Sequence, residues 1–375
     1  MLSFELGNKA TTDLQRLTGK IQQAVDVLDA LKTEERLAMQ RYAFISNIGA
    51  STRIENAVLT NTEIDWLDDT LSKDARPSSF EAYKEAILNK LSKDKERSIE
   101  EVAGCREFLH YVYTQGSALR PLTETVLRQL HEQLLKYYPK ARPYLGQYKI
   151  APNSVVSINH QSGEQKNILK TADPGPATKM AMQTLVDWYR AEIDEHPWTI
   201  AVACDFIFRF LAIHPFQDGN GRMSRGLFVL TLLQAPQINL SKLTPYLAID
   251  RKIEQNRQEY YFVLRQCSEG LFNEDPTQYK VYYFLDFMIK IMNLAVDDLP
   301  FYREKYTRFL KLNPNAKKVL ACFRENPELR FSSSRLLSLI PLPRQTMIYT
   351  LNVLVNKEFL QRQGSGPLTD YQLIF

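Results

Sequence analysis

The stretch HPFQDGNGRMSR, His214 to Arg225, decides how the rest of the chain is interpreted. It separates two apolar runs, AVACDFIFRFLAI before it and GLFVLTLL after it. Between them stand a histidine, an acid, an asparagine, two glycines and two arginines. Polar groups in such a setting cost free energy unless each one has a partner. The partners are therefore either internal or supplied by a ligand.

The glycines place this polar cluster at the start of a helix. GNG is a poor helix interior, and Arg222 opens a new apolar helical period. The free backbone N–H groups at such an N-terminus favour an anion. Gly219 and Gly221 let the backbone approach that anion closely. Arg222 and Arg225 are three residues apart on one helical face, so both are placed to bind a polyphosphate.

Two further residues of the stretch suggest chemistry. Asp218, beside a phosphate site, is suited to hold Mg²⁺ together with phosphate oxygens. His214 is suited to accept a proton at neutral pH. The set predicts a nucleotide–Mg²⁺ site with a general base, and hence phosphoryl or nucleotidyl transfer. A buried loop bonded only to itself is the alternative, and the number of matching polar groups disfavours it.

These residues resemble the signature of the Fic domain, HPFx[D/E]GNGRxxR, at every fixed position. The resemblance extends over roughly residues 30–290. It implies transfer of AMP from ATP to a Ser, Thr or Tyr hydroxyl of a target protein, with His214 deprotonating that hydroxyl and Asp218 positioning Mg²⁺. The residues that it implies for phosphate binding are Gly219, Asn220, Gly221, Arg222 and Arg225. Gly221 stands where the Doc branch carries lysine, which disfavours kinase chemistry.

The resemblance also implies roles outside the motif. The segment IDRKIEQNRQEYYFVL resembles the adenine-side helix, so Asn256 and Tyr260 are expected to contact the nucleotide; a plain helix is the alternative there. GQYKIAPNSVVSINHQSG (Gly146–Gly163) has β-branched residues on either side of Pro152-Asn153 and is interpreted as a β-hairpin. By resemblance this hairpin is the flap that pairs with an extended target segment by strand addition. The expected docking residues are Lys149, Ile150, Val155 and Val156, with Lys149 standing where many relatives have arginine.

A second motif, STRIEN, lies upstream at residues 51–56. Alone it indicates only a solvated helical face. Beside the first motif it resembles the family's inhibitory signature [S/T]xxxE[G/N], with Ser51, Glu55 and Asn56. The resemblance implies that Glu55 pairs with Arg225 in place of the γ-phosphate and misaligns ATP, and a misplacement of about an ångström costs on the order of a hundredfold in rate. Use of Glu55 to orient a water for AMP removal stays open.

The remaining chain is mainly helical by its apolar period. The predicted fold class is mainly α: a Fic-type helical core with a small β-hairpin flap, an N-terminal helical extension and a C-terminal winged helix. The predicted domains are 1–110, an N-terminal helical region with the inhibitory motif, 111–295, the catalytic core, and 301–375, the winged helix. One or two helices are expected over 13–47. Further helices are expected over 81–91, 99–115, 123–138, 178–193, 197–234 (broken only at HPFQDGNGR), 249–267, 279–296, 315–326, 332–340 and 343–359.

Beyond Phe301 the order helix, helix–turn–helix and two-stranded wing is that of a winged-helix domain. This segment carries 12 Lys and Arg against 5 Asp and Glu, a balance of +7, so with a total of +4 the first 300 residues sum to −3. Such a balance suggests DNA, but the expected recognition helix has only Arg344 and Lys357 as cations. A protein-interaction or dimer module is the alternative. A DNA-associated regulator that senses nucleotide without much turnover is the second candidate function.

Composition narrows the class of protein. The 375 residues are 44% hydrophobic and 24% charged, which is typical of a globular protein. The four cysteines are far apart and lack a CxxC pair, and the five histidines form no HExxH, so a structural zinc site is disfavoured. The start has no basic region followed by an apolar block. We therefore expect a cytoplasmic protein without a membrane anchor. The motif and the resemblance imply ATP and Mg²⁺ as cofactors and a target protein as partner, and a homodimer is an open alternative.

Overall fold

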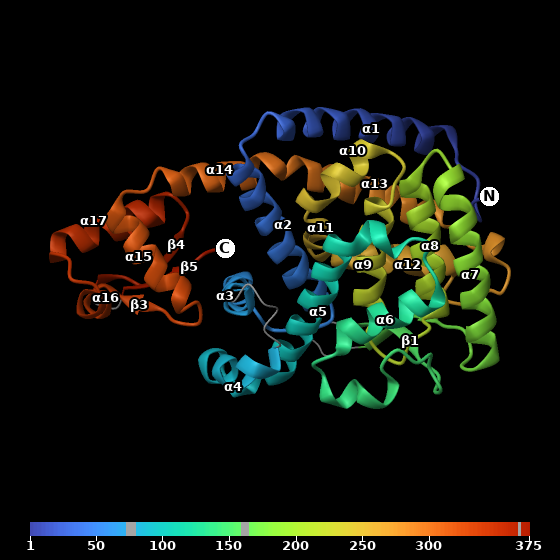
Figure 1. The fold of residues 1–375 in the computed structure, drawn as a ribbon, viewed down its shortest axis with the longest axis horizontal. Helices are drawn as coiled ribbons and strands as arrows, with labels where there is room; N and C mark the ends of the chain where they lie inside the picture. The colour runs from blue at the N-terminus through green and yellow to red at the C-terminus, as the bar shows by residue number, and fades with distance from the viewer. Residues whose placement is uncertain (73–79, 159–164, 367–368) are drawn as a thin grey trace. The chain divides into compact units, whose positions relative to one another are not determined.

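The computed structural model describes residues 1–72, 80–158, 165–366 and 369–375. The chain is mainly helical with a small two-stranded hairpin, which confirms the predicted fold class to that extent (Figure 1). It divides into two compact units. The first unit combines Met1–Ala57 with Glu100–Leu299, and the second combines Val58–Ile99 with Pro300–Phe375. This division differs from the expected boundary near residue 110, because residues 58–99 group with the C-terminal segment.

Eleven helices make up most of the first unit. They are α1 (Asn8–Asp29), α2 (Thr33–Ile54), α5 (Glu96–Gln115, from Glu100 onward), α6 (Glu124–Leu135), α7 (Pro176–Glu195), α8 (Thr199–Ile213), α9 (Asn220–Leu233), α10 (Ile238–Leu243), α11 (Ile249–Gln255), α12 (Arg257–Ser268) and α13 (Tyr282–Asp297). Short 3-10 turns connect some of them: η2 (Gly116–Leu119), η3 (Pro139–Tyr144), η4 (Thr244–Tyr246) and η5 (Pro276–Gln278).

The centre of this unit is α8, whose residues are buried on every side. Its sequence is apolar nearly throughout, so it has no solvent face to present, and it packs against α7, α9 and α13. Next to it, α9 approaches α5 closely at Gly226, where a Cβ atom would come within 2.2 Å of the Phe108 ring. Helix α1 packs on α10 and α13, and α2 packs on α9 and α11. These contacts explain why the N-terminal helices belong to this unit.

The predicted hairpin is present but shifted along the chain. Strands β1 (Ser154–Ile158) and β2 (Gln165–Lys170) are antiparallel, with an irregular register between Val155 and Val156. Pro152-Asn153 therefore precedes the hairpin instead of forming its turn. Residues 159–164, between the two strands in the sequence, lie outside the described residues.

Helix boundaries differ from the prediction in several places. The single helix predicted over 249–267 is broken at Asn256, where φ is −115° and ψ is 30°, into α11 and α12. Three helices were not predicted: α3 (Asn61–Ser72), α10 and α14 (Leu299–Leu310). The described helices include none long and apolar enough to cross a membrane.

The second unit contains α3, α4 (Phe80–Leu91), the turn η1 (Lys93–Lys95) and the C-terminal elements. The latter are α14 from Pro300 onward, α15 (Pro314–Glu325), β3 (Phe331–Ser332), α16 (Ser333–Leu339), α17 (Arg344–Asn356), β4 (Leu360–Gln363) and β5 (Asp370–Leu373). Phe323, Phe331 and Leu351 belong to one apolar core. The sheet has the order β3-β5-β4, so the expected two-stranded wing gains a third strand. The sequence predicts the turn of the wing at Gly364–Pro367, and Pro367 lies outside the described residues.

Candidate active site

The site begins where α8 ends. His214 follows Ile213 in a left-handed conformation (φ 52°, ψ 60°), and its N–H donates to the carbonyl of Phe210 at 2.8 Å. This turn stops α8 and brings the imidazole to a cavity of about 220 Å³. The cavity collects His214, Asp218, Gly219, Asn220, Gly221 and Arg225 from the motif, Glu55 from the end of α2, Val155 and Val156 from β1, and Tyr260 from α12. Segments far apart in the sequence therefore meet around one space.

The motif glycines do start a helix, as predicted. Gly219 precedes α9 in a left-handed conformation (φ 81°), which glycine adopts without strain. The side chain of Asn220 bonds within the motif loop. Its side-chain oxygen accepts from the Phe216 N–H at 2.9 Å, and its amide donates to the Phe216 carbonyl at 2.7 Å. The side chain thus closes the loop on itself, which leaves the backbone N–H groups of α9 as the groups suited to an anion.

Arg222 is held by two acids without being saturated by them. Its Nη2 lies 3.6 Å from Asp218 Oδ1 and its Nη1 lies 3.8 Å from Glu101 Oε2. The arginine side chain is only 3% exposed, and its Nε and Nη1 form no hydrogen bond with the part of the chain that is described. A buried guanidinium with unused donors fits an anionic ligand.

Arg225 is bound to the end of α2. Its Nε donates to Ser51 Oγ at 3.0 Å, and its Nη2 donates to the Ser51 carbonyl at 2.8 Å and to Glu55 Oε1 at 2.9 Å. Asp250 Oδ2 lies 3.8 Å from Nε. Burial alone lowers the pKa of Arg225, but Glu55 and Asp250 outweigh burial and raise it above the ordinary value. The guanidinium is therefore charged, and its Nε and Nη2 are engaged.

The STRIEN motif has a direct structural explanation. Ser51 and Glu55 are four residues apart, so they share one face of α2, and both bond to Arg225. Glu55 is the residue that follows the last turn of α2, and Asn56 takes a left-handed conformation (φ 76°). Apart from glycine, asparagine is the residue that most readily adopts this conformation at a helix end. This accounts for Gly or Asn at the last position of the motif.

Glu55 also lies over the glycines of the motif. A Cβ atom added to Gly221 would come within 2.2 Å of Glu55 Oε1. The carboxylate therefore sits against the start of α9, where the backbone favours a negative charge. The 220 Å³ cavity beside it is smaller than the roughly 300 Å³ at which small-molecule sites usually begin.

Lys149 does not belong to an exposed docking surface, contrary to the expectation. The side chain is 2% exposed, and its Nζ donates to Asn153 Oδ1 at 2.9 Å, Thr171 Oγ1 at 3.0 Å and the Ile213 carbonyl at 2.9 Å. Its backbone N–H donates to the Pro215 carbonyl at 2.8 Å. The physical reason is that a buried ammonium needs several acceptors, and the end of α8 supplies one of them. Lys149 therefore supports the backbone around His214.

The other predicted docking residues differ in exposure. Ile150 is 91% exposed and Val156 is 39% exposed, whereas Val155 is buried. Ile150 precedes β1 and does not lie on a strand. Of the four residues expected to face a target, Ile150 and Val156 present apolar surface.

Electrostatics keep His214 neutral. Desolvation, and after it the charge of Lys149, lower the pKa of His214 to about 4. Its Nδ1 forms no hydrogen bond with the described residues. Desolvation likewise lowers the pKa of Lys149 to about 8. At neutral pH the imidazole is therefore in the form that accepts a proton.

Of the two residues expected to contact the nucleotide from the adenine-side segment, one lines the cavity and the other does not. Tyr260 lines the cavity, as does Tyr261, which was not predicted. Asn256 is not among the lining residues, because its side chain is engaged elsewhere. It donates to the Lys252 carbonyl at 2.8 Å and accepts from Lys290 Nζ at 3.2 Å. The break between α11 and α12 places it there.

Three buried polar residues near the motif were missed. They are Glu101 beside Arg222, Asp250 beside Arg225, and His131, which bonds to the Asp218 carbonyl. Each comes from a separate helix with ordinary helical spacing. The signal that could have found them is a polar side chain on a predicted buried face.

The residues present fit a magnesium ion only together with a ligand. The described ranges contain no group of three or more His, Cys, Asp or Glu that could hold a metal. Asp218, whose side chain is 39% exposed, is the carboxylate of the cavity that remains accessible beside the α9 N-terminus. One carboxylate with phosphate oxygens and waters is the usual coordination of Mg²⁺.

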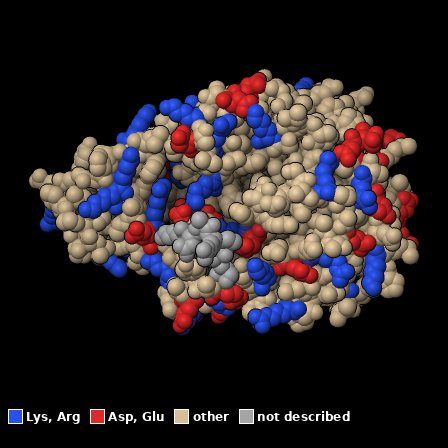
Figure 2. Space-filling model, in the orientation of Figure 1, with Lys and Arg blue, Asp and Glu red and all other residues tan. Residues whose placement is uncertain are grey.

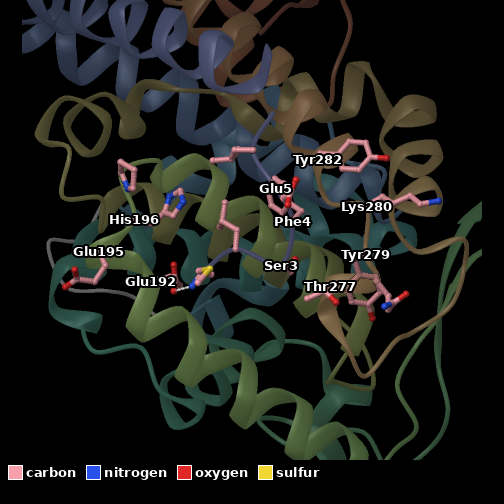
Figure 3. A pocket seen from close by; sticks show the side chains of 15 residues that line it. Ser3, Phe4, Glu5, Glu192, Glu195, His196, Thr277, Tyr279, Lys280 and Tyr282 are labelled. Atoms are coloured by element: carbon pink, nitrogen blue, oxygen red, sulfur yellow. Dashed lines mark hydrogen bonds and ion pairs between the residues drawn. The ribbon is translucent and has the colours of Figure 1, made fainter. Parts of the chain in front are cut away.

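A larger groove of about 1050 Å³ lies elsewhere in the first unit (Figure 3). It is lined by residues 1–6, by residues 192 and 195–197 at and after the end of α7, and by residues 277–280 and 282. Two of its charged groups are already paired: Glu192 with the N-terminal ammonium and Lys280 with Glu269. Since the groove lacks the motif residues, we assign the chemistry to the smaller cavity.

The comparisons with known proteins agree with this site. Residues 121–232 match the model of the Fic/DOC family. The curated protein adenylyltransferase Fic of Drosophila willistoni is 32% identical over 100 residues, which are 26% of this chain and 18% of that relative. The match thus spans less than a fifth of the relative's length.

Two crystal structures share the fold. A Fic family protein from Desulfovibrio desulfuricans aligns with a TM-score of 0.57 and 21% identity, covering 100% of this chain and 98% of that chain. A Fic-domain signaling protein from Bacteroides thetaiotaomicron aligns with a TM-score of 0.54 and 22% identity over 77% of this chain and 98% of its own. The family match spans the cavity residues from Asn153 to Arg225, while Glu55 and Tyr260 lie outside it. The chain therefore contains a Fic domain, and HPFQDGNGRMSR is its motif.

Proposed function

We propose that this protein is an adenylyltransferase that moves AMP from ATP to a Ser, Thr or Tyr hydroxyl of a target protein and of itself. Fic proteins are typically transferases that move a nucleotide, generally AMP, onto proteins. The observation that carries the proposal for this chain is one cavity shared by His214, Asp218, Arg225 and the N-terminus of α9. That set combines a proton acceptor, a carboxylate and anion-binding groups.

The reaction follows from the properties of these groups. The target hydroxyl oxygen attacks the α-phosphorus of ATP, the bond to the β-phosphate breaks, and pyrophosphate leaves. The hydroxyl proton goes to His214, which is neutral at pH 7. The α9 N-terminus, Arg222 and Arg225 would bind the phosphate oxygens and offset their charge. Catalysis then rests on positioning and charge.

Asp218 would hold Mg²⁺ with the phosphate oxygens of ATP. When bound, the ion supplies positive charge where negative charge builds up on the leaving group. Arg222 lies 3.6 Å from the same carboxylate. The arginine and an ion held by Asp218 would therefore act on the same phosphate group.

We further propose that Glu55 inhibits the enzyme. Its carboxylate accepts a hydrogen bond from Arg225 Nη2 and fills the space over Gly221. A terminal phosphate would need the same donor and the same space. A carboxylate and a phosphate repel each other and compete for the same donors. The proposal therefore predicts that activity depends on the release of the end of α2.

Mass spectrometry tests the reaction class. The purified chain is incubated with ATP and Mg²⁺, and peptides are searched for added AMP on Ser, Thr or Tyr. The matched control is His214→Ala, which should lose the modification while still binding nucleotide. AMP addition that survives in His214→Ala, or a transferred group other than AMP, would overturn the proposal. The same experiment run on pre-modified protein detects AMP removal, for which Glu55 is the candidate base.

The C-terminal unit does not add a DNA site to this proposal. Lys and Arg side chains are exposed over α14–α17 on the face drawn in Figure 2, and residues 301–375 carry a charge balance of +7. On α17 itself, however, Ile348 is 42% exposed and Tyr349 is 64% exposed. Exposed apolar side chains on α17 suit a protein partner better than a phosphate backbone. A salt-dependent shift of duplex DNA on a gel would instead show that the C-terminal unit binds DNA. A cytoplasmic location stays a prediction.

A further inference from the structure

His131 is a buried histidine outside the motif that touches the motif loop in three ways. It comes from α6 and is 0% exposed. Its ring stacks on the ring of Phe216, with centroids 3.9 Å apart and planes within 5°. Both of its nitrogens lie at hydrogen-bond distance from backbone atoms, Nδ1 at 3.1 Å from the Gly146 nitrogen and Nε2 at 3.0 Å from the Asp218 oxygen.

These two partners determine the tautomer. The Gly146 N–H can only donate, so Nδ1 must carry its lone pair and accept. The Asp218 carbonyl can only accept, so Nε2 must carry the hydrogen and donate. The ring therefore links the segment before the flap, at Gly146, to the motif loop, at Asp218, as a neutral imidazole with the hydrogen on Nε2.

The bond to Asp218 has a consequence for the next residue. The Asp218 carbonyl and the Gly219 N–H belong to one trans peptide, so they point in opposite directions. With the carbonyl turned toward α6, the N–H of Gly219 is turned away from it. That N–H donates to Asp218 Oδ1 at 2.6 Å, which holds the carboxylate on the same side.

The contact between loop and helix is close. A Cβ atom at Gly219 would come within 3.3 Å of Leu134 Cδ2 and 3.6 Å of His131 Nε2. The loop thus lies directly on α6, and the ring is the group of α6 that bonds to its backbone.

We propose that His131 is a positioning residue whose Nε2–H sets the orientation of the Asp218–Gly219 peptide. Through the Gly219 N–H, which bonds to Asp218 Oδ1, that orientation directs the Asp218 carboxylate toward the phosphates of a bound nucleotide. The inference rests on the proposed function for the identity of that nucleotide. The stacking on Phe216 holds the ring plane, and the Gly146 bond holds its rotation. Neither bond touches the reacting atoms.

Two substitutions separate the two bonds. The amide of glutamine reaches about as far as Nε2, so His131→Gln keeps a donor for the Asp218 carbonyl. The oxygen of asparagine reaches about as far as Nδ1, so His131→Asn keeps the bond to the Gly146 N–H. Its amide is too short to replace Nε2, so the bond to the Asp218 carbonyl is lost. His110→Asn, at an exposed position of α5, is the matched control.

Affinity for ATP·Mg²⁺ is measured by calorimetry in the Glu55→Gly background, together with kcat and KM for AMP transfer. We expect His131→Asn to weaken nucleotide binding by about tenfold, the loss expected when a buried carbonyl keeps no donor. His131→Gln should restore most of that affinity, and His110→Asn should change nothing. Thermal unfolding of each variant shows whether the protein is folded.

A spectroscopic readout accompanies the affinities. In ¹⁵N NMR of the unsubstituted chain, Nδ1 of His131 should give the signal of an unprotonated nitrogen and Nε2 that of a protonated one. The opposite tautomer would overturn the proposal, and so would equal losses of affinity in folded His131→Asn and His131→Gln. Nucleotide binding and the tautomer are read without catalysis, so a failure of AMP transfer alone would refute the proposed function and not this role of His131.

Discussion

Replacing Glu55 by glycine should activate the enzyme. The substitution removes the carboxylate that lies 2.9 Å from Arg225 Nη2 and against Gly221. Arg225 keeps its bonds to Ser51, and Asp250 remains 3.8 Å from its Nε, so the arginine is not left without partners. What changes is that the donor and the space beside the α9 N-terminus become available to a phosphate.

The size of the effect follows from one hydrogen bond. A hydrogen bond to a charged group contributes about 1.5–3 kcal/mol. The Glu55 side chain is 33% exposed, and solvent screening reduces its contribution to about 1–2 kcal/mol. That difference corresponds to a roughly 5–30-fold change in an equilibrium. We therefore expect a rise of this order in AMP transfer at ATP concentrations below KM.

The assay is auto-modification with ATP labelled at the α-phosphate, with Glu55→Gln as an intermediate case that keeps the shape and loses the charge. Glu34→Gln, an exposed acid in the first turn of the same helix, is the matched control and should behave like the unsubstituted chain. If Glu55→Gly gains neither rate nor ATP affinity, the contact with Arg225 does not inhibit. If label is still incorporated in the double variant with His214→Ala, His214 is not the base.

Four further outcomes are expected. His214→Ala should abolish transfer while ATP·Mg²⁺ still shifts the Tm, because the phosphate-binding groups remain; loss of the shift would contradict this. Asn56→Val should destabilise the end of α2 by about 1–2 kcal/mol, because a β-branched residue would have to adopt φ 76°. It should also raise the rate of AMP transfer, whereas Asn56→Gly should not. An equal response to both variants would count against a role for the left-handed conformation of Asn56. Ser3→Ala should lower the free energy of unfolding by about 1–3 kcal/mol, because Ser3 Oγ donates to buried Asp205 at 2.7 Å; unchanged denaturant unfolding would contradict it. Burial raises the pKa of Asp250 to about 6 despite the neighbouring Arg225, so the folded state binds this proton more tightly than the unfolded state. The stability of the unsubstituted chain relative to Asp250→Asn should therefore fall as the pH rises from about 4 through 6. Parallel curves of Tm against pH across that range would refute it.

The sequence predicted the centre of the site because its signals are local. The motif residues from His214 to Arg225 are contiguous, and a glycine pair before an apolar period marks a helix start on its own. The same holds for STRIEN, whose hydroxyl and acid are one helical turn apart. Both motifs could therefore be placed before any tertiary contact was known.

What the sequence did not reveal depends on contacts between distant segments. His131, Asp250 and Glu101 carry no special spacing, and only the packing of their helices brings them to the motif. Lys149 looked like an exposed flap residue because its acceptors at Asn153, Thr171 and Ile213 are scattered through the chain. The division of the chain differs from the expected one for a similar reason, since residues 58–99 group with the C-terminal segment.

The closed loop at the motif has a consequence for how nucleotide binding responds to temperature. Asn220 bonds both backbone groups of Phe216, so the loop is ordered when the protein folds. A ligand that arrives at a loop of this kind loses little affinity to conformational entropy. The entropy change of ATP binding should then come mainly from water and from the end of α2. Removing Glu55 should consequently alter the entropy of binding more than any substitution within the loop that preserves the Asn220 bonds.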